Sequence, residues 1–559
     1  MNKLNLRFHQ KLIVYKTLEI ISKGDKEILI AAKPRSGKTY IVGGIILEFC
    51  KNKISNILVV TPAPKETMDQ FLIDLFKKYY DFKNFNILNP ITSNEIINLK
   101  LKNNISNIIL VSKQVLQLVL KNNIIKNINL FFFDENHFGG TTDLSINMIN
   151  KFSNKNTIKI YLTATFQKSL ETFNISIQNI LNWDLEDEIF CKQRNIKNLI
   201  LKHGKIVKNF IKSDNDLKIY DEYPSLLILT ILFDSKFYNK LKMSNFYLIK
   251  MSDIFKIELN KFKNENFVKI IVSYIYKEMF LRINNISLKY NSKRMKTQIW
   301  FLPTVNIDEI SYNLKIICEN TKGLSNFDYL ILNSKNNYKD IKKHIYTCEL
   351  KAKLSKKDGL IIFVGNMLQL GITLKNCDTV ILLNHTMTYD RITQSIYRCM
   401  SESNGKKFGY VIDFNISRVL ESLLKYNTYN KSLSNIDKIK YLIENKIINI
   451  DIDKGTTTQI IKKLISFYND NNINENIIHF FNTNKIKSLL LYMLSILNND
   501  IYNQTIYNQI QDMIENINNL TLIQINKFLY NFIINIKKYN LNDKNNKIIF
   551  KIYDMCKIE

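Results

Sequence analysis

The sequence has few cysteines and no stretch suited to a membrane. Its seven cysteines are scattered and never form a Cys-x-x-Cys pair, so neither a disulfide framework nor a cysteine zinc site is expected. No apolar run approaches the roughly 18 to 20 residues of a membrane span. The polar stretch 1–10 carries no signal peptide. These absences predict an intracellular, non-membrane protein in a reducing compartment.

Acidic residues are outnumbered by basic ones. The 559 residues include 79 Lys and Arg against 50 Asp and Glu, which gives a formal net charge of +29. An excess spread along the chain favours a polyanionic partner, meaning DNA or RNA. AT-rich coding sequence would also inflate lysine without selection for binding, so charge alone leaves both explanations open.

Short apolar runs, each suited to one buried strand, recur in two regions. The first region has runs at 28–31, 57–60, 108–111, 130–133 and 158–162, and the second at 298–302, 329–333, 360–364, 380–383 and 410–414. Helix-length stretches separate several of them, which is typical of a parallel sheet covered on both faces. We therefore expect an α/β protein with two parallel-sheet domains facing a cleft.

The remaining sequence shows mostly helical periodicity. A chain of this length is expected to form roughly three to four domains. The predicted boundaries are 1–168 for the first α/β domain, 169–295 for a mostly helical insertion, 296–415 for the second α/β domain and 416–559 for a helical accessory domain.

A phosphate-binding loop is the clearest motif. The first predicted strand runs into Ala32-Lys33-Pro34-Arg35-Ser36-Gly37-Lys38-Thr39, and a helical pattern follows. In this context, backbone N–H groups of the loop and of the helix N-terminus can hold phosphate oxygens. Lys38 is then placed to reach the β and γ phosphates, and Thr39 to bind Mg²⁺. The alternative is an ordinary strand-to-helix turn, since Ala32 stands where the general pattern has glycine.

An acidic box, Asp134-Glu135-Asn136-His137, follows the strand predicted at 130–133. Asp134 falls at the carboxyl end of that strand, where ligands collect in open α/β sheets, and would hold Mg²⁺ through water. Glu135 is the candidate general base for the attacking water. His137 is the candidate link between the nucleotide and neighbouring loops. A plain polar turn is the alternative, which the upstream phosphate loop disfavours.

These motifs resemble those of superfamily 2 helicases and translocases of the Asp-Glu-x-His type. Segments 6–10, 61–64 and 163–165 resemble the adenine-reading motif, motif Ia and motif III, and 111–114 resembles the strand-end loop that follows motif Ia. Segments 300–303, 365–374 and 394–398 resemble motifs IV, V and VI. The resemblance covers roughly 1–168 and 296–415. It implies two RecA-like domains that bind ATP and Mg²⁺ between them and hold the nucleic-acid backbone on strand-end loops.

The resemblance assigns site residues in three groups. The expected ATP-binding residues are Gln10, Ala32, Lys33, Pro34, Arg35, Ser36, Gly37, Lys38 and Thr39. The expected catalytic residues are Lys38, Asp134, Glu135, His137, Gln394 and Arg398. The expected nucleic-acid contacts are Thr61, Pro62, Ser112, Lys113, Thr163, Thr165, Trp300 and Gly371.

Motif VI departs from the family pattern. Two arginines three residues apart are usual, but Ser401 stands in the second position and leaves Arg398 as the motif's arginine finger. An arginine finger is worth about 10³ to 10⁵ in rate. Hydrolysis therefore requires Arg398 to act alone or with help from Arg391, Lys406 or Lys407.

The motifs predict an ATP-dependent helicase or translocase acting on DNA, slightly favoured, or RNA. The wording of motifs V and VI, including 397–402, also resembles helicase-like proteins of large cytoplasmic DNA viruses. This implies a viral transcription or replication complex as partner and the host cytoplasm or virion as location. Three alternatives stay open: a double-strand DNA translocase that does not unwind, a degenerate ATPase acting as a nucleic-acid-binding scaffold, and the motor of a restriction-type complex, for which the chain has no nuclease signature.

Three further features are given ordinary structural roles. The acidic cluster 184–188 could hold a metal, but a solvated helix start is favoured. His9 is expected to belong to the adenine-motif region without binding a ligand. Cys399 is expected to be a buried structural thiol.

Overall fold

A computed structural model describes most of the chain up to residue 451 and one later helix. The described residues are 2–62, 66–120, 127–134, 143–164, 175–231, 237, 251–333, 340–368, 373–384, 389–426, 435–451 and 504–515. The chain forms two compact units, one made of 1–231, 250–438 and 444–451, the other of 232–249, 439–443 and 452–559. The first unit contains both sheets described below. Helix α22 (Gln504–Glu515) belongs to the second unit.

The first sheet has the strand order β3-β4-β2-β5-β6-β1-β7, with every pairing among these strands parallel. Its strands are β1 (Glu27–Ala32), β2 (Asn56–Thr61), β3 (Asn86–Leu88), β4 (Asn107–Ser112), β5 (Leu130–Phe133), β6 (Ile158–Thr163) and β7 (Ile180–Trp183). The helices that accompany it are α1 (Phe8–Ser22), α2 (Lys38–Phe49), α3 (Glu66–Phe71), α4 (Ser93–Ile97), α5 (Lys113–Leu118) and α6 (Asp143–Phe152).

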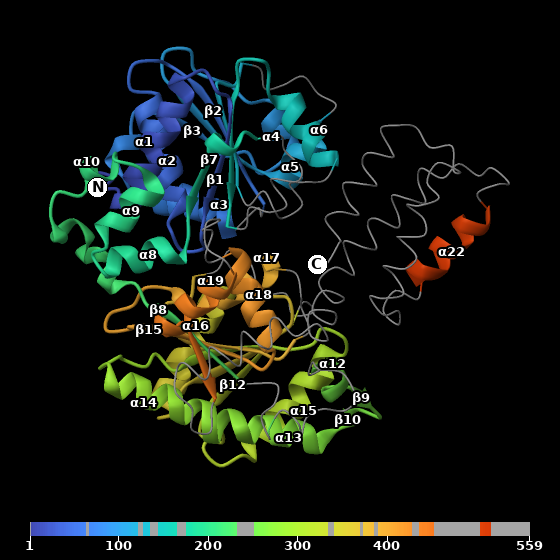
Figure 1. Ribbon diagram of the computed structural model, residues 1–559. Coiled ribbons are helices and arrows are strands. Elements are labelled where there is room, and N and C mark those ends of the chain that lie inside the picture. The colour runs from blue at the N-terminus through green and yellow to red at the C-terminus, as the bar shows by residue number, and fades with distance from the viewer. Residues whose placement is uncertain are drawn as a thin grey trace. The chain divides into compact units, whose positions relative to one another are not determined.

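Alternation along the buried strands explains why helices cover both faces of this sheet (Figure 1). Ile28 and Ile30 of β1 join a core that includes residues of α1 and α2, whereas Leu29 joins a second core with residues of α5 and α6. Successive strand side chains point to opposite faces, so a run that is apolar throughout needs cover on both sides. The predicted α/β layering is confirmed.

The second sheet has the order β12-β13-β11-β14-β15-β8-β16 and is also parallel throughout its described pairings. Its strands are β8 (Ser225–Ile231), β11 (Thr297–Phe301), β12 (Asp328–Leu332), β13 (Leu360–Val364), β14 (Cys377–Leu382), β15 (Phe408–Asp413) and β16 (Ile448–Asp451). The helices of this part are α12 (Met251–Ile254), α13 (Glu265–Tyr274), α14 (Leu281–Lys289), α15 (Ile307–Glu319), α16 (Ile341–Leu354), α17 (Tyr389–Ile396), α18 (Ile416–Tyr426) and α19 (Asn435–Glu444). A short hairpin joins β9 (Ile257–Glu258) to β10 (Lys261–Phe262).

The segment between the two predicted domains also supplies strands, which the sequence prediction did not include. β7 pairs with β1 of the first sheet, and β8 pairs with β15 of the second. Between them lie α8 (Leu185–Lys192), α9 (Ile196–His203) and α10 (Val207–Phe210). The apolar stretch 226–231 is buried along its whole length, as in the strands that were predicted. Each sheet thus extends beyond its predicted range, and the second also gains β16 after residue 415.

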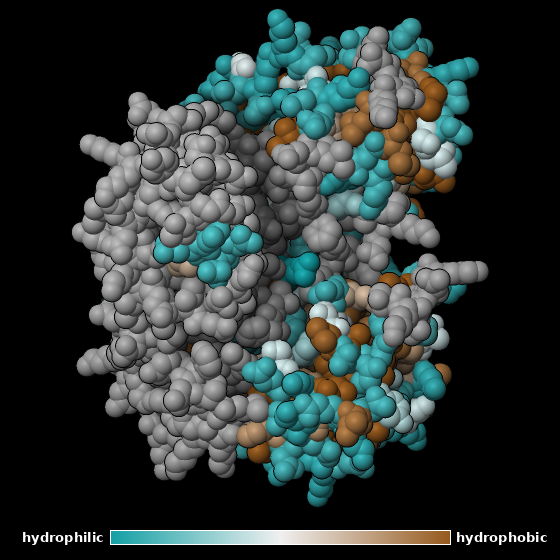
Figure 2. Space-filling view, turned by 90° about the vertical axis from the view of Figure 1, so that its right-hand side faces the viewer, coloured by the Kyte–Doolittle hydropathy of each residue, from teal (hydrophilic) through white to brown (hydrophobic). Residues whose placement is uncertain are grey.

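On the face shown in Figure 2, hydrophilic side chains cover most of the described area, with hydrophobic residues gathered in smaller patches. None of the helices in the described part of the chain combines the length and the apolar character that crossing a bilayer requires.

Candidate active site

The phosphate loop connects β1 to α2 at the carboxyl edge of the first sheet. Gly37 directly precedes α2 with a φ of 78°, a left-handed conformation that favours glycine. A Cβ added to Gly37 would lie 2.5 Å from Nε2 of Gln10, so the loop leaves no space for a side chain there. Lys38 and Thr39 form the first turn of α2, where free N–H groups and the helix dipole favour an anion.

Two residues of α1 hold this loop. Gln10 accepts a hydrogen bond from the backbone N–H of Arg7 (3.0 Å) and donates through Nε2 to the carbonyl of Ser36 (3.1 Å). His9 lies 2.7 Å from the same carbonyl through Nε2, and its Nδ1 lies 2.6 Å from the Tyr220 hydroxyl. Gln10 therefore lies at the phosphate loop with its amide engaged by protein groups, and its expected part in ATP binding stays a prediction.

His9 has a role in loop geometry that the sequence did not reveal. Its ring is fully buried and stacks on Trp183 at 4.8 Å between ring centroids. Burial lowers the pKa of His9 to about 4, so the ring is neutral at physiological pH. A neutral ring that faces a carbonyl must carry its proton on Nε2, so Nδ1 accepts from the Tyr220 hydroxyl. His9 thus helps to position the phosphate loop through its hydrogen bond to the Ser36 carbonyl.

The acidic cluster 184–188 is buried, so the prediction of a solvated helix start is wrong. Glu188 is 1% exposed and lies 2.6 Å from Nζ of Lys33 in the phosphate loop. Lys202 lies within 3.2 Å of carboxylate oxygens of three other members of the cluster. Burial alone would raise the pKa of Glu188, but the charges of Lys33 and Lys192 lower it below its ordinary value. The cluster therefore serves as an ionic anchor for the loop.

The acidic box is described only in part. Asp134 follows β5 directly, is 8% exposed, and donates its backbone N–H to the carbonyl of Val60 (2.9 Å). It lines the same cavity as Lys38 and Thr39. Glu135 and His137 lie outside the described residues, so their predicted roles remain predictions.

One cavity of about 650 Å³ brings the candidate nucleotide residues together. Its lining from the first sheet includes Gln10, Pro34, Arg35, Ser36, Gly37, Lys38, Thr39 and Asp134, and its lining from the second includes Thr373, Gln394, Tyr397, Arg398 and Ser401. Lys33 instead points into the buried ion pair, with its Nζ also 5.2 Å from the Tyr397 ring centroid. Ala32 is the last residue of β1, and its carbonyl accepts from Nζ of Lys38 (3.3 Å).

The two lysines considered as helpers for Arg398 are engaged elsewhere. Lys406 is buried and donates to the carbonyls of Cys377 (2.7 Å) and Ser401 (2.8 Å). Lys407 donates to the carbonyl of Tyr290 (2.8 Å). Neither lysine lines the cavity that Arg398 lines.

Two residues that line the cavity form a bidentate ion pair with each other. Arg7 donates from its two terminal nitrogens to the Glu402 carboxylate at 2.7 and 2.9 Å, and its guanidinium lies 4.7 Å from the Tyr223 ring centroid. Burial alone would lower the pKa of Arg7, but the bond to Glu402 and the neighbouring charges raise it above its ordinary value. Residues just before α1 and just after motif VI are therefore joined directly.

Several residues expected to contact nucleic acid have side chains turned inward. Thr61, Ser112, Thr163 and Trp300 are fully buried, and Ser112 accepts a hydrogen bond from the backbone N–H of Val115 as the cap of α5. The structure contradicts the prediction for Trp300, because its ring is fully buried within the second sheet beside Phe363 and its Nε1 donates to Oε1 of Gln298 (3.0 Å). The ring belongs to a strand that is buried on both faces.

Of the other four predicted nucleic-acid contacts, two lie within the described residues and two do not. Lys113 begins α5, and Pro62 lines the nucleotide cavity. Thr165 and Gly371 lie outside the described residues.

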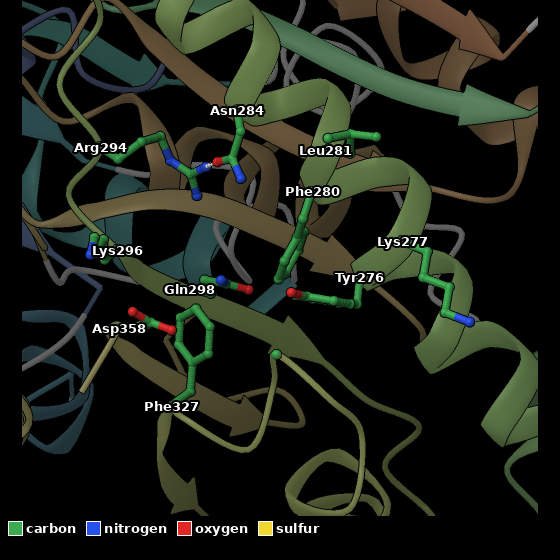
Figure 3. A pocket seen from close by; sticks show the side chains of 11 residues that line it. Tyr276, Lys277, Phe280, Leu281, Asn284, Arg294, Lys296, Gln298, Phe327 and Asp358 are labelled. Atoms are coloured by element: carbon green, nitrogen blue, oxygen red, sulfur yellow. Dashed lines mark hydrogen bonds between the residues drawn. The ribbon is translucent and has the colours of Figure 1, made fainter.

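A second cavity, of about 490 Å³, lies at the amino end of β11 (Figure 3). Phe280 and Tyr276 project into it from one side and Phe327 from the other. Arg294 donates to Asn284 (2.7 Å) at one end. Parallel sheets collect ligands at the carboxyl ends of their strands, and this cavity lies at the opposite edge. We therefore treat it as separate from the nucleotide site.

Comparison with known proteins agrees with this architecture. Residues 3–168 match the family model described as "Type III restriction enzyme, res subunit". A search of the curated proteins finds no significant match. Among solved structures, the chain is similar to the ATP-dependent Type ISP restriction-modification enzyme LlaBIII bound to DNA, with a TM-score of 0.52 and 13% identity over 90% of this chain and 36% of that chain.

A second similar structure is the Mycobacterium smegmatis helicase Lhr bound to ssDNA and AMP-PNP, with a TM-score of 0.37 and 11% identity over 74% of this chain and 47% of that chain. This chain thus spans well under two thirds of either structure's length. The likeness to the Type ISP enzyme shows a shared fold of two RecA-like sheets. The family match covers residues 3–168, the part of the chain that contains β1 to β6.

Proposed function

We propose that the chain is a nucleic-acid-dependent ATPase that works as a helicase or translocase. The observation that carries the proposal is the cavity of about 650 Å³ that Lys38, Thr39 and Asp134 line from one sheet and Gln394 and Arg398 from the other. ATP hydrolysis between two such sheets can drive closing and opening. The basic chain and the family match support nucleic acid as the partner.

The residues present suit ATP and Mg²⁺. The N–H groups at the start of α2 would hold the phosphates, and Lys38 would leave the carbonyl of Ala32 for the β and γ oxygens. Thr39 would bind Mg²⁺ directly and Asp134 through water. When bound, Mg²⁺ supplies charge neutralisation on the phosphate oxygens. The buried hydroxyl of Ser36 has no hydrogen-bond partner among the described residues and lines the same cavity.

Catalysis needs groups from both sheets. Glu135, one residue beyond Asp134, would accept a proton from the attacking water as general base. Gln394 and Arg398 would face the γ phosphate from the second sheet once the cavity closes. The loops after β2, β4 and β6 would contact the nucleic-acid backbone, with Lys113 among the contacts, and His137 would couple the nucleotide to these loops. Contacts to phosphates make binding independent of sequence and sensitive to salt.

Two finer roles have specific support. The match of residues 3–168 to a restriction res subunit favours the motor of a restriction-type complex, a motor that need not separate strands. The amino-acid sequence of motifs V and VI, through its resemblance to helicase-like proteins of large DNA viruses, instead favours a viral transcription or replication complex. A co-purified nuclease or methyltransferase subunit would select the first, and a co-purified RNA or DNA polymerase the second.

The test is ATP hydrolysis measured without nucleic acid, with single-stranded DNA, with double-stranded DNA and with RNA, each at two salt concentrations. We expect stimulation by at least one nucleic acid, weakened at high salt and abolished in Lys38→Ala and Glu135→Gln. A strand-displacement assay separates unwinding from translocation alone. Equal, low hydrolysis under all conditions would refute the motor and leave the scaffold alternative.

A further inference from the structure

Arg35 is a phosphate-loop residue that reaches the second sheet. Its Nη1 donates to Oγ1 of Thr373 at 2.5 Å, and its side chain lines the nucleotide cavity. Its charge also acts on the turn that carries motif VI. Burial raises the pKa of the Cys399 thiol to about 12, while the charges of Lys406 and Arg35 act in the opposite direction. Arg35 and residues of this turn, including Arg398 and Ser401, line the same cavity.

The same turn has an arginine position filled by serine. Ser401 is 3% exposed, and its carbonyl accepts from Lys406. Its hydroxyl is buried without a hydrogen-bond partner among the described residues, although it lines the nucleotide cavity. Motif VI thus brings one guanidinium, that of Arg398, to the cavity, and Arg35 brings another from the opposite sheet.

We propose that Arg35 takes the place of the second arginine that motif VI lacks and stabilises the transferred phosphoryl group. This inference rests on the proposed ATPase function. In the reaction, the water oxygen bonds to the γ phosphorus and the water proton passes to Glu135. The bond from the γ phosphorus to the bridging oxygen breaks, and its electron pair leaves with ADP. Arg35 and Arg398 would face the γ-phosphate oxygens from the two sides of the cavity. Their positive charges would stabilise the negative charge that these oxygens carry in the transition state.

The backbone supports a functional reason for arginine at this position. Arg35 has a φ of 70°, a left-handed conformation in which glycine is the favoured residue. Strained residues of this kind persist at ligand sites because the surrounding structure holds them. Burial lowers the pKa of Arg35 to about 10, so the side chain is still charged at neutral pH.

The deciding variant is Arg35→Gly in the full-length chain, because glycine relieves the backbone strain while removing the guanidinium. We expect kcat for ATP to fall by about 100-fold or more. The Kd for ADP should stay within about threefold of wild type, because Arg35 is proposed to act on the transition state. The tighter binding of ADP in the presence of aluminium fluoride, a mimic of the transferred phosphoryl group, should be lost. Arg35→Lys should retain only part of the rate, since lysine keeps the charge but not the planar fork.

Arg194→Gly is the matched control. Arg194 is also an arginine at positive φ (57°), but it pairs with Asp221 at 2.6 Å and does not line the cavity. Its ATPase rate should equal that of wild type. Wild-type turnover in Arg35→Gly would overturn the proposal. So would a loss of ADP binding, or a fall in Tm, large enough to explain the lower rate.

Failure of the proposed function gives a different result. A wild-type chain without turnover under any condition would count against the ATPase itself. If wild type and Arg35→Gly then also bound ADP with aluminium fluoride equally well, the role of Arg35 would be refuted too.

Discussion

The ion pair between Lys33 and Glu188 leads to a sharp prediction about stability. The two charged atoms lie 2.6 Å apart, with side chains 7% and 2% exposed. Glu188→Gln would leave the Lys33 ammonium buried beside a neutral group. Removing one partner of a buried pair costs about 3 to 5 kcal/mol, because the remaining charge is uncompensated. For a unit of this size, whose unfolding entropy at about 2.1 cal/mol/K per residue is large, that corresponds to a fall in Tm of about 3 to 6 °C.

Differential scanning calorimetry at pH 7.5 would measure this fall. Glu258→Gln is the control, because it makes the same substitution in an exposed pair with Lys263 and should change Tm far less. Lys33→Met combined with Glu188→Gln should recover part of the loss, since the buried Lys33 charge is removed as well. Lys192, which also pairs with Glu188 at 3.1 Å, is 17% exposed and keeps access to water. Equal shifts in the two single variants would refute the claim that burial gives this pair its weight.

The same pair has a pH signature. The pKa of Glu188 is lowered in the folded chain, so its contribution to stability is present above its ordinary pKa of 4.5. The contribution is lost as the pH falls through the lowered folded-state value. The difference in Tm between wild type and Glu188→Gln should therefore shrink as the solution becomes more acidic than about pH 4.5. A difference that stays constant down to acid unfolding would contradict the assignment.

Three other predictions concern the residues around the phosphate loop. Gly37→Ala should abolish ADP binding in equilibrium dialysis, because the added Cβ would lie 2.5 Å from Gln10 and the residue has a left-handed backbone conformation. ADP binding as tight as that of the wild type would contradict this loop geometry. The folded-state pKa of His9, about 4, lies below its ordinary value of 6.5. The stability of the wild-type chain, measured by urea titration, should therefore decline as the pH falls from 6.5 to about 4. His9→Gln should make this decline smaller. In a double-mutant cycle, the stability losses of Arg7→Ala and Glu402→Ala should be coupled and not additive. We expect a coupling energy of about 1 kcal/mol, because both side chains are partly exposed. Strict additivity would mean that the ion pair does not form in solution.

Much of the fold could be predicted because its signals are local. The ten apolar runs chosen from the sequence all correspond to strands of the two sheets, since a buried parallel strand is apolar along its whole length. Strand β8 carries the same signal at 226–231 but lies in a region of helical periodicity, which concealed it. Strands β7 and β16 have four residues each, too few for a clear pattern.

The candidate site was predictable where it depends on spacing and was missed where it depends on distant contacts. Spacing identified Lys38, Thr39 and Asp134, and the structure brings these three into one cavity. Nothing near His9 in the sequence indicates that Tyr220 fixes its ring, and nothing near Lys33 indicates Glu188. Burial of the acidic cluster was also hidden, because carboxylates are buried only when cations from elsewhere in the chain reach them.

The pairing of β8 with β15 has a consequence for synthesis of the chain. β8 leaves the ribosome long before β15, the strand that will pair with it, and β16 follows later still. Until then its apolar side chains and unpaired backbone groups are available to other chains. Truncations that end between residues 232 and 407 would leave β8 permanently without either neighbour. Such fragments should collect in inclusion bodies, whereas expression that extends past residue 451 gives the strand both of its partners.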